Sequence, residues 1–288
     1  MKNLGVYRSG KNAPEQVSLY EQWLGRPITH AVDFVGRGDT WTIDNPAWLA
    51  KRWATNPWTP VITAAMVPNA DYALVDGALG AFNNHWQKFG TQLVKNGCAD
   101  AILRIGHEFN GRFYPWKAEG KEKHFVAYWR EIVKTLRKVP GQKFLFDWCP
   151  LAGVTSVNVE AAYPGDDYVD IIGLDAYDTA LPKYLGKPTE RWQYQLDRPY
   201  GLVWHATFAA KHNKPMSFPE WGLTFRPKDK IGGGDNPHYI TKMWDWFKTH
   251  DIAYAAYFED DTPSNSHRLM TDQFPKSSAE YQKLVKQG

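Results

Sequence analysis

The sequence of 288 residues has little cysteine, little net charge and no long apolar segment. Its two cysteines, Cys98 and Cys149, are too few for a disulfide framework and lack the spacing of a metal-binding pair, so we expect two buried free thiols. The net charge of +3 is too small to indicate a nucleic-acid partner, which would require a clustered basic face. No apolar run approaches the roughly 18 residues of a membrane span, so we expect no membrane partner.

The signatures of several enzyme classes are also absent. The sequence contains no nucleophile elbow, phosphate loop or dinucleotide fingerprint. His107 and Glu108 begin like a zinc-protease helix, but the fourth residue after His107 is Gly111 rather than a second histidine. The nine histidines show no metal-ligand spacing, so we expect neither a metal nor a cofactor.

Aromatic residues, by contrast, are abundant, with 14 Trp, 15 Tyr and 14 Phe. Many must belong to the core, because these side chains bury large areas. Several tryptophans, however, stand in segments with glycine, asparagine, aspartate or proline, as in Asn56-Pro57-Trp58 and Tyr114-Pro115-Trp116. Aromatic rings on loops suit the flat faces of sugars, so composition favours a carbohydrate ligand.

Segments typical of strands and of helices alternate along the whole chain. Eight short apolar or β-branched runs read as strands: Leu4–Tyr7, Thr29–Val35, Val61–Val67, Ala101–Ile105, Lys143–Trp148, Tyr168–Asp175, Lys214–Pro219 and Ile252–Phe258. The clear helical patterns between and after them are Pro46–Trp53, Asn84–Asn96, Lys121–Lys138, Pro199–His212, Pro237–His250 and Ser277–Lys286. Strands separated by helices predict βαβ units and a parallel sheet. Eight such units without a linker predict a single (β/α)8 barrel domain over residues 1–288, with a doubly wound open sheet as the alternative.

Catalytic groups of such barrels stand at the carboxyl ends of strands, and the fourth strand ends in a glutamate. Arg104, Gly106 and Glu108 share one face of this strand, because side chains alternate. Glu108 would therefore stand at the barrel mouth with Arg104 below it, and Asn110 follows closely. The alternative is a surface glutamate paired with Arg104.

The seventh strand also ends in a glutamate, Glu220, between Pro219 and Trp221. The fourth and seventh strands lie across the mouth of an eight-stranded barrel, so both carboxylates can face one bond. Two carboxyl groups about 5–5.5 Å apart are what a retaining glycosidase needs, one as nucleophile and one as acid/base. The alternative for Glu220 is a structural ion pair.

Neighbouring strand ends supply candidate substrate-binding groups. Asp175 and Tyr177 share a face at the end of strand six, where the Tyr177 hydroxyl could donate a hydrogen bond to a carboxylate on strand seven. Three tryptophans, Trp116, Trp148 and Trp221, each fall just beyond a strand end, where we expect them to line sugar subsites.

These motifs together resemble glycoside hydrolase family 26, the β-mannanase-like family of the large retaining clan. That family has His-Glu at the end of strand four, with an upstream arginine and downstream aromatics, matching Arg104, His107, Glu108, Tyr114 and Trp116 here. Its nucleophile ends strand seven, matching Glu220, and its strand-six Asp-x-Tyr matches Asp175 and Tyr177. Strand eight differs, since Tyr257-Phe258-Glu259-Asp260 stands where the family usually offers a tryptophan.

The resemblance implies a retaining, endo-acting hydrolase of β-linked polysaccharide, with Glu220 as nucleophile and Glu108 as acid/base. Mannan-like polymers, bacterial exopolysaccharides, β-glucans and xylans all stay open as substrates, as does a catalytically silent barrel that only binds glycan. The amino-terminal segment MKNLGVYRSG lacks the apolar stretch of a signal peptide, so the protein either stays in the cytoplasm or has lost its leader. We expect a secreted or cell-surface monomer.

Overall fold

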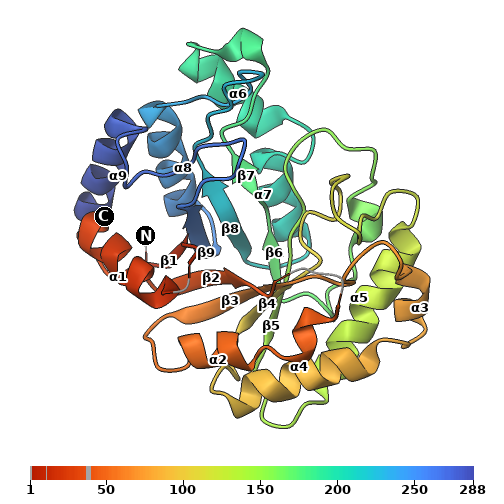
Figure 1. The fold of residues 1–288 in the computed structure, drawn as a ribbon. Coiled ribbons are helices and arrows are strands. Elements are labelled where there is room, and N and C mark those ends of the chain that lie inside the picture. The colour runs from red at the N-terminus through yellow and green to blue at the C-terminus, as the bar shows by residue number, and fades with distance from the viewer. Residues whose placement is uncertain (1, 11, 37–39) are drawn as a thin grey trace. The chain divides into compact units, whose positions relative to one another are not determined.

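The structure is a computed structural model that describes residues 2–10, 12–36 and 40–288 (Figure 1). The chain divides into two compact units. Unit 1 comprises residues 1–32, 152–154 and 174–288, and unit 2 comprises residues 33–151 and 155–173. Each unit consists of parallel strands with helices between them.

Unit 1 contains both ends of the chain and five strand segments. Its strands are β1 (Leu4–Tyr7), the first residues of β2 (His30–Phe34), β7 (Ala176–Tyr177), β8 (Met216–Gly222) and β9 (Ile252–Phe258). Strand β1 pairs in parallel with β2 and with β9, and β8 pairs in parallel with β7 and with β9. Its helices are α1 (Ala13–Leu24), the 3-10 turn η3 (Pro182–Tyr184), α6 (Pro188–Asp197), α7 (Leu202–Lys211), α8 (Pro237–Thr249) and α9 (Pro275–Gln287). Helix α9 packs against α8 and α1 (Figure 1).

Unit 2 contains the middle strands. They are β3 (Thr59–Ala64), β4 (Ile102–Ile105), β5 (Leu145–Trp148) and β6 (Ile171–Gly173), and successive members pair in parallel. Its helices are η1 (Thr42–Asp44), α2 (Ala47–Trp53), α3 (Leu74–Ala78), α4 (Asn83–Lys95), α5 (Glu122–Arg137) and η2 (Glu160–Ala162).

The strand order of the sheet is β6-β5-β4-β3-β2-β1-β9-β8-β7. Parallel strands in this order, with helices between them, form a (β/α)8 barrel, so the predicted fold class is confirmed. All eight predicted strands are present, and the sixth is split into β6 and β7 at Leu174 and Asp175. The sequence patterns missed helices α1, α3 and α6, while the helix expected from Pro199 begins only at Leu202.

Helix α5 shows how the helices anchor the strand ends. Its buried residues Phe125, Trp129, Ile132 and Leu136 follow the spacing of three or four that places side chains on one helix face. The Trp129 Nε1 donates a hydrogen bond of 3.2 Å to the carbonyl of Ile105, the last residue of β4. The packing of α5 therefore holds the end of the strand that carries the first candidate glutamate.

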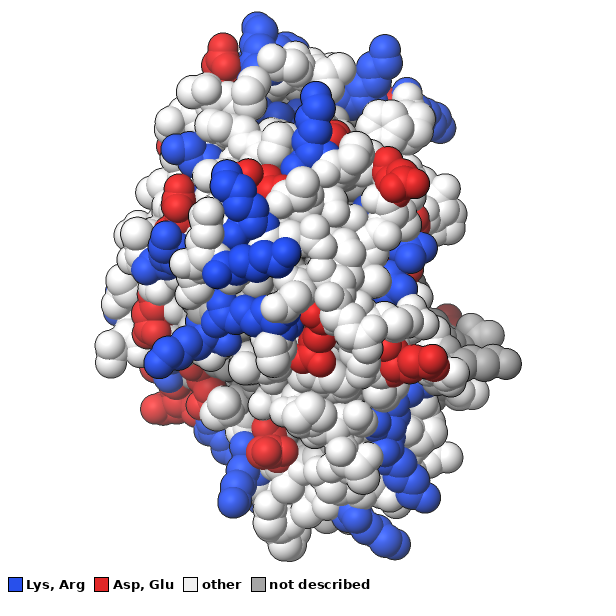
Figure 2. Space-filling view, turned by 90° about the vertical axis from the view of Figure 1, so that its left-hand side faces the viewer, with Lys and Arg blue, Asp and Glu red and all other residues white. Residues whose placement is uncertain are grey.

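Two further observations concern the surface and the thiols. On the face shown in Figure 2, acidic side chains lie among the lysines and arginines, so that face has no continuous surface of one charge. Among the described residues, every helix is too short or too polar to cross a bilayer. Cys98 and Cys149 are buried and free, as predicted.

Gly106 forms a tight turn directly after β4. Its φ of +58° lies in the left-handed region that favours glycine. A Cβ atom at this position would lie only 2.5 Å from the Sδ atom of Met66, which is fully buried. Both the backbone and the packing therefore require glycine here.

We predict that Gly106→Ala destabilises the protein more than Gly120→Ala. Gly120 also has a positive φ, of +67°, but a Cβ atom added there would meet no other atom within 4 Å. The left-handed alanine costs roughly 1–2 kcal/mol at either site, and overpacking against Met66 adds roughly 1–3 kcal/mol at Gly106. Urea denaturation of both variants measures the difference, and equal midpoints would contradict the packing argument.

Candidate active site

The end of β4 in unit 2 carries Glu108 in an unusual backbone conformation. Its φ is +50°, which is rare for a residue with a side chain and costs roughly 1–3 kcal/mol. The backbone is held from both sides, because the Glu108 N–H donates to the carbonyl of Cys149 and the Glu108 carbonyl accepts from the Gly111 N–H, each at 2.8 Å. With only 8% of its surface exposed, Glu108 is a nearly buried carboxylate in a strained, fixed turn.

An aromatic group surrounds His107, the residue before Glu108. The His107 Nε2 lies 3.0 Å from the Tyr114 hydroxyl, and the His107 carbonyl accepts a 2.8 Å hydrogen bond from Trp116 Nε1. Tyr114 and Trp116 stack nearly parallel, with ring centroids 4.4 Å apart. The ring of Phe34 meets His107 edge to face. These contacts fix the imidazole beside the glutamate.

Arg104 and Asn110 flank this group in unit 2. Arg104 is fully buried on β4, and its Nη1 lies 3.4 Å from the Thr63 hydroxyl. The Asn110 amide exchanges two 2.8 Å hydrogen bonds with the backbone of Leu151. Asn110 therefore ties the loop after β4 to the loop after β5, and its amide donates to and accepts from protein backbone.

The end of β8 in unit 1 carries the second glutamate. Glu220 is 7% exposed, and its Oε2 accepts a hydrogen bond of 2.8 Å from the hydroxyl of Tyr177 on β7. The hydrogen bond expected between the strand-six tyrosine and a strand-seven carboxylate is therefore present. It fixes the orientation of the carboxylate. Asp175, two residues before Tyr177, is fully buried, and its carbonyl accepts from the Ala152 N–H at 3.0 Å.

His267 packs directly against Tyr177, with ring centroids 5.0 Å apart. Its Nδ1 lies 2.7 Å from the Leu223 carbonyl, which only accepts hydrogen bonds, so this nitrogen carries the proton. Burial lowers the pKa of His267, against the raising effects of the Leu223 hydrogen bond and of nearby carboxylates that include Glu220. A neutral imidazole thus supports the ring that holds Glu220.

Glu259, at the end of β9, contrasts with Glu220. Its carboxylate accepts hydrogen bonds from the N–H groups of Leu269 and Met270, at 2.7 and 2.9 Å, and it is fully buried. Burial raises the pKa of Glu259 to about 7. Because no part of it reaches the surface, Glu259 ties a loop to β9, whereas Glu220 keeps an exposed edge. Among the described residues, no cluster of three His, Cys, Asp or Glu side chains could hold a metal ion.

Comparison with known proteins identifies the family. The model of glycosyl hydrolase family 26 matches residues 38–188, just over half of the chain. The chain belongs to glycosyl hydrolase family 26. The matched segment includes Glu108 and Tyr177, while Glu220 lies beyond it.

The curated relatives are distant in sequence and longer than this chain. The chain is 25% identical over 246 residues to endoglucanase H of Acetivibrio thermocellus, which covers 77% of this chain and 26% of that protein. It is 23% identical over 219 residues to mannan endo-1,4-beta-mannosidase A and B of Caldalkalibacillus mannanilyticus, covering 67% of this chain and 42% of the relative. The chain thus spans less than half the length of each of these relatives.

Solved structures agree on the fold. The catalytic domain of a family 26 endo-beta-1,4-mannanase from Bacillus sp. JAMB-750 has a TM-score of 0.69 at 18% identity, covering 99% of this chain and 86% of that one. GH26C from Muricauda sp. MAR_2010_75 has a TM-score of 0.68 at 15% identity, covering 99% and 85%. At such identities the likeness concerns the fold alone.

The structure corrects the expectation for the three tryptophans. Trp116, Trp148 and Trp221 have no exposed surface, so they fill the core of their units and line no open subsite. The indole N–H groups of Trp116 and Trp148 donate to backbone carbonyls, and Trp221 packs edge to face against Phe247 and other rings. A strand end is close to the protein interior, and rings of this size bury there.

The contacts of the predicted residues form two sets, one in each unit. Arg104, His107, Glu108, Asn110, Tyr114, Trp116 and Trp148 belong to the unit 2 set, and Asp175, Tyr177, Glu220 and Trp221 to the unit 1 set. His267 was missed by sequence reasoning, because it stands alone in a loop without metal-ligand spacing. Its position shortly after the strand-eight segment is the only signal that could have indicated it.

Tyr177→Phe is predicted to reduce hydrolysis about tenfold to a hundredfold, because one charge-assisted hydrogen bond contributes roughly 1.5–3 kcal/mol. The ring contacts with Phe258 and His267 remain, so the fold should be retained. Turnover on a polysaccharide panel and circular dichroism measure the two effects. The matched control is Tyr163→Phe, which loses a hydrogen bond to Asp166 instead. Equal activity of both variants would remove Tyr177 from the site.

Trp221→Ala should lower the free energy of unfolding by roughly 3–5 kcal/mol, as truncation of a buried aromatic ring does. The control is Trp48→Ala, whose side chain is 48% exposed and should change stability far less. Thermal or urea unfolding measures both. A small change for Trp221→Ala would show that the ring is not part of the core.

Proposed function

We propose that this family 26 chain is a retaining, endo-acting glycoside hydrolase of β-linked polysaccharide. In this proposal Glu220 is the nucleophile and Glu108 is the acid/base. The observation that carries it is the 2.8 Å hydrogen bond from the Tyr177 hydroxyl to Glu220, a carboxylate that keeps only 7% of its surface exposed at a strand end.

In the first step, Glu220 attacks the anomeric carbon. A nucleophile needs an oxygen held in a defined direction, and the hydrogen bond from Tyr177 to one carboxylate oxygen supports that requirement. The ring of His267 packs against Tyr177 and helps to hold the tyrosine in place. The product of this step is a covalent glycosyl-enzyme, and the leaving oxygen must receive a proton.

Glu108 is proposed to give that proton and then to act as base toward water. The rigid turn at Glu108 favours this role, because an acid/base group must keep one position through both steps. His107, fixed by Tyr114 and Trp116, would contact hydroxyl groups of the reacting sugar. Arg104 supplies a buried positive charge on β4, the strand that precedes Glu108.

The substrate class rests on the relatives. Both are named for internal cleavage of β-linked polymers, an endoglucanase and a mannan endo-1,4-beta-mannosidase. We therefore propose a mannan-like or bacterial exopolysaccharide as substrate, with other β-glucans and xylans to be included in a screen. Polymers of this size do not cross membranes, so the chain would act as a secreted or cell-surface monomer with one catalytic domain.

Alanine variants of the two glutamates should lose activity in different ways. Glu220→Ala removes the attacking group, so no substrate should be cleaved. Glu108→Ala removes only the proton donor, so an activated aryl β-glycoside should still form the glycosyl-enzyme and then stall. Azide is a nucleophile that needs no base, so it should restore turnover of the Glu108→Ala variant and give a β-glycosyl azide. With the Glu220→Ala variant, azide should instead give the α-glycosyl azide. Proton NMR identifies the anomer of each glycosyl azide. The same measurement on the first sugars that the unmodified enzyme releases should show the β configuration retained.

Exposed Glu15 on α1 supplies the control, since Glu15→Ala should keep full activity. Identical behaviour of the Glu108 and Glu220 variants on all substrates would refute the assigned roles. An inverted first product would refute the retaining mechanism, and a wild-type chain that binds but never cleaves any glycan would indicate a binding barrel.

A further inference from the structure

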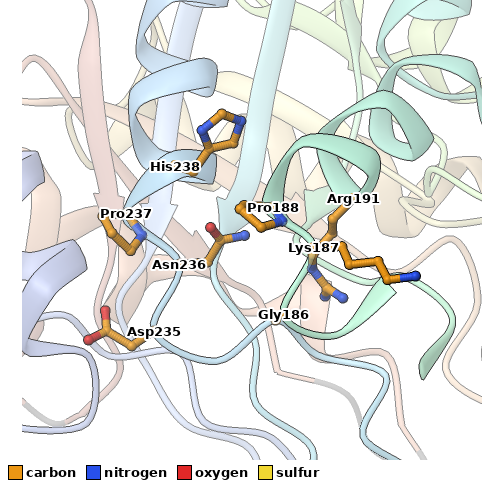
Figure 3. Close-up of a pocket in the computed structure, with 9 residues that line it drawn as sticks. Gly186, Lys187, Pro188, Arg191, Asp235, Asn236, Pro237 and His238 are labelled. Carbon is orange, nitrogen blue, oxygen red and sulfur yellow. The ribbon is translucent and has the colours of Figure 1, made fainter. Parts of the chain in front are cut away.

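Unit 1 contains a polar pocket between the amino-terminal ends of helices α6 and α8 (Figure 3). Its volume is about 220 Å³, and residues lining it include Gly186, Lys187, Arg191, Asp235, Asn236 and His238. Ligand pockets for whole small molecules usually measure about 300–1,000 Å³. This one therefore suits a single substituent of a larger molecule.

A buried charge cluster adjoins the pocket and shares Arg191 with it. Arg191 Nε donates to Asp178 Oδ1 at 2.6 Å, and the two side chains are 3% and 0% exposed. A second guanidinium, that of Arg198, is also buried and donates to the carbonyl and hydroxyl of Thr179. Among the described residues that contact this cluster, Asp178 is the only carboxylate bonded to it. With Lys187 and the Asp235 carboxylate, which both line the pocket, three cations stand against two carboxylates, an excess of one positive charge.

One nitrogen of Arg191 has no hydrogen-bond partner among the described residues. Arg191 Nη1 is inaccessible to bulk solvent and unpaired, although Nη2 donates to the carbonyls of Asp178 and Ile231. In Figure 3 the guanidinium lies beside the Gly186 turn. Guanidinium nitrogens only donate, and a buried donor left unpaired is unfavourable. Arg191, which lines the pocket, therefore keeps one donor without an acceptor among the described residues.

Two other polar side chains of the pocket, Asn236 and Asp235, are already engaged by protein groups. The Asn236 amide donates to Asp178 Oδ2 and accepts from the Tyr239 N–H, and the Asp235 carboxylate accepts from the N–H and hydroxyl of Ser277. His238 Nε2 is buried and also without a hydrogen-bond partner in the described part of the chain. Both helices begin with proline, which has no N–H, so their positive ends act through charge more than through backbone donors.

We propose that this pocket binds an oxyanion, the carboxylate of an acidic sugar unit, through Arg191 with Lys187 at its rim. Asp178 directly follows Tyr177, so the pocket lies next to the strand end that holds Glu220. A polysaccharide extends beyond the bond that is cut, and a charged substituent on it can reach a site outside the reacting subsite. The oxyanion chemistry stands on the pocket alone, whereas the sugar as its source rests on the proposed function.

Isothermal titration tests the proposal at fixed, low ionic strength in the Glu220→Ala background, so that no bond is cut. The probes are a β-linked tetrasaccharide with one glucuronate, the neutral tetrasaccharide with glucose in its place, and inorganic phosphate. The glucuronate probe should bind at least about tenfold more tightly than the neutral one. Arg191→Lys should abolish this preference, because lysine keeps the charge toward Asp178 but lacks the guanidinium fork.

Because Arg191→Lys removes part of a buried cluster, the exposed rim provides a second variant. Lys187→Gln should weaken glucuronate binding about two- to fivefold, as expected for an exposed charge. The matched control is Lys248→Gln, which removes the same charge from the last turn of α8, about 15 Å along the helix from His238. Lys187→Gln should leave hydrolysis of neutral polysaccharide unchanged.

Binding of phosphate without a preference for glucuronate would overturn the acidic sugar as the ligand. Equal effects of Lys187→Gln and Lys248→Gln, or no binding of either anion, would overturn the pocket itself. Because titration does not depend on hydrolysis, a chain that cleaves neutral polysaccharide but ignores glucuronate fails only this inference. A chain that binds glucuronate but cleaves nothing fails only the proposed function.

Discussion

A carboxylate that leaves water must find hydrogen-bond donors or cations, and the strand ends of this protein depend on that requirement. Unit 1 meets it in three ways. Glu220 accepts from the Tyr177 hydroxyl, Asp178 is paired with Arg191, and Glu259 accepts from two backbone N–H groups. Of these three carboxylates, Glu220 alone keeps an exposed edge, which is why we propose it as the one that reacts.

The partners of these carboxylates also connect the candidate site to the surrounding helices and loops. Arg191 on α6 binds the carbonyl and carboxylate of Asp178, one residue after Tyr177, so the helix fixes the tyrosine that orients Glu220. Gly233 leaves the necessary space, because a Cβ atom there would lie 2.0 Å from Asp178 Oδ2. In unit 2 the equivalent task falls to backbone geometry, since the left-handed turn at Glu108 is held by Cys149 and Gly111. Glu108 and Glu220 are thus positioned by different means.

The tryptophans show where residue chemistry alone misleads. An indole is both large and able to donate one hydrogen bond, so it suits a sugar subsite and a barrel core equally well. In Trp116 and Trp148 the indole N–H meets a backbone carbonyl in the interior, which satisfies the one polar atom and makes full burial favourable. A position just after a strand does not distinguish these outcomes, because the difference lies in which neighbours close over the ring.

Local sequence determined the features that depend on neighbouring residues. Alternating apolar runs and helical periodicity specify eight strands and the barrel. The expectation that strand alternation places Arg104 and Glu108 on one face was wrong, because β4 ends at Ile105 and a left-handed turn at Gly106 precedes Glu108. The Tyr177–Glu220 hydrogen bond was also predictable, since adjacent parallel strands end side by side. Tertiary structure alone decided the burial of Trp221, the packing of His267 on Tyr177 and the unpaired nitrogen of Arg191. Each of these depends on contacts between residues far apart in the chain, and such contacts leave no periodic trace in the sequence.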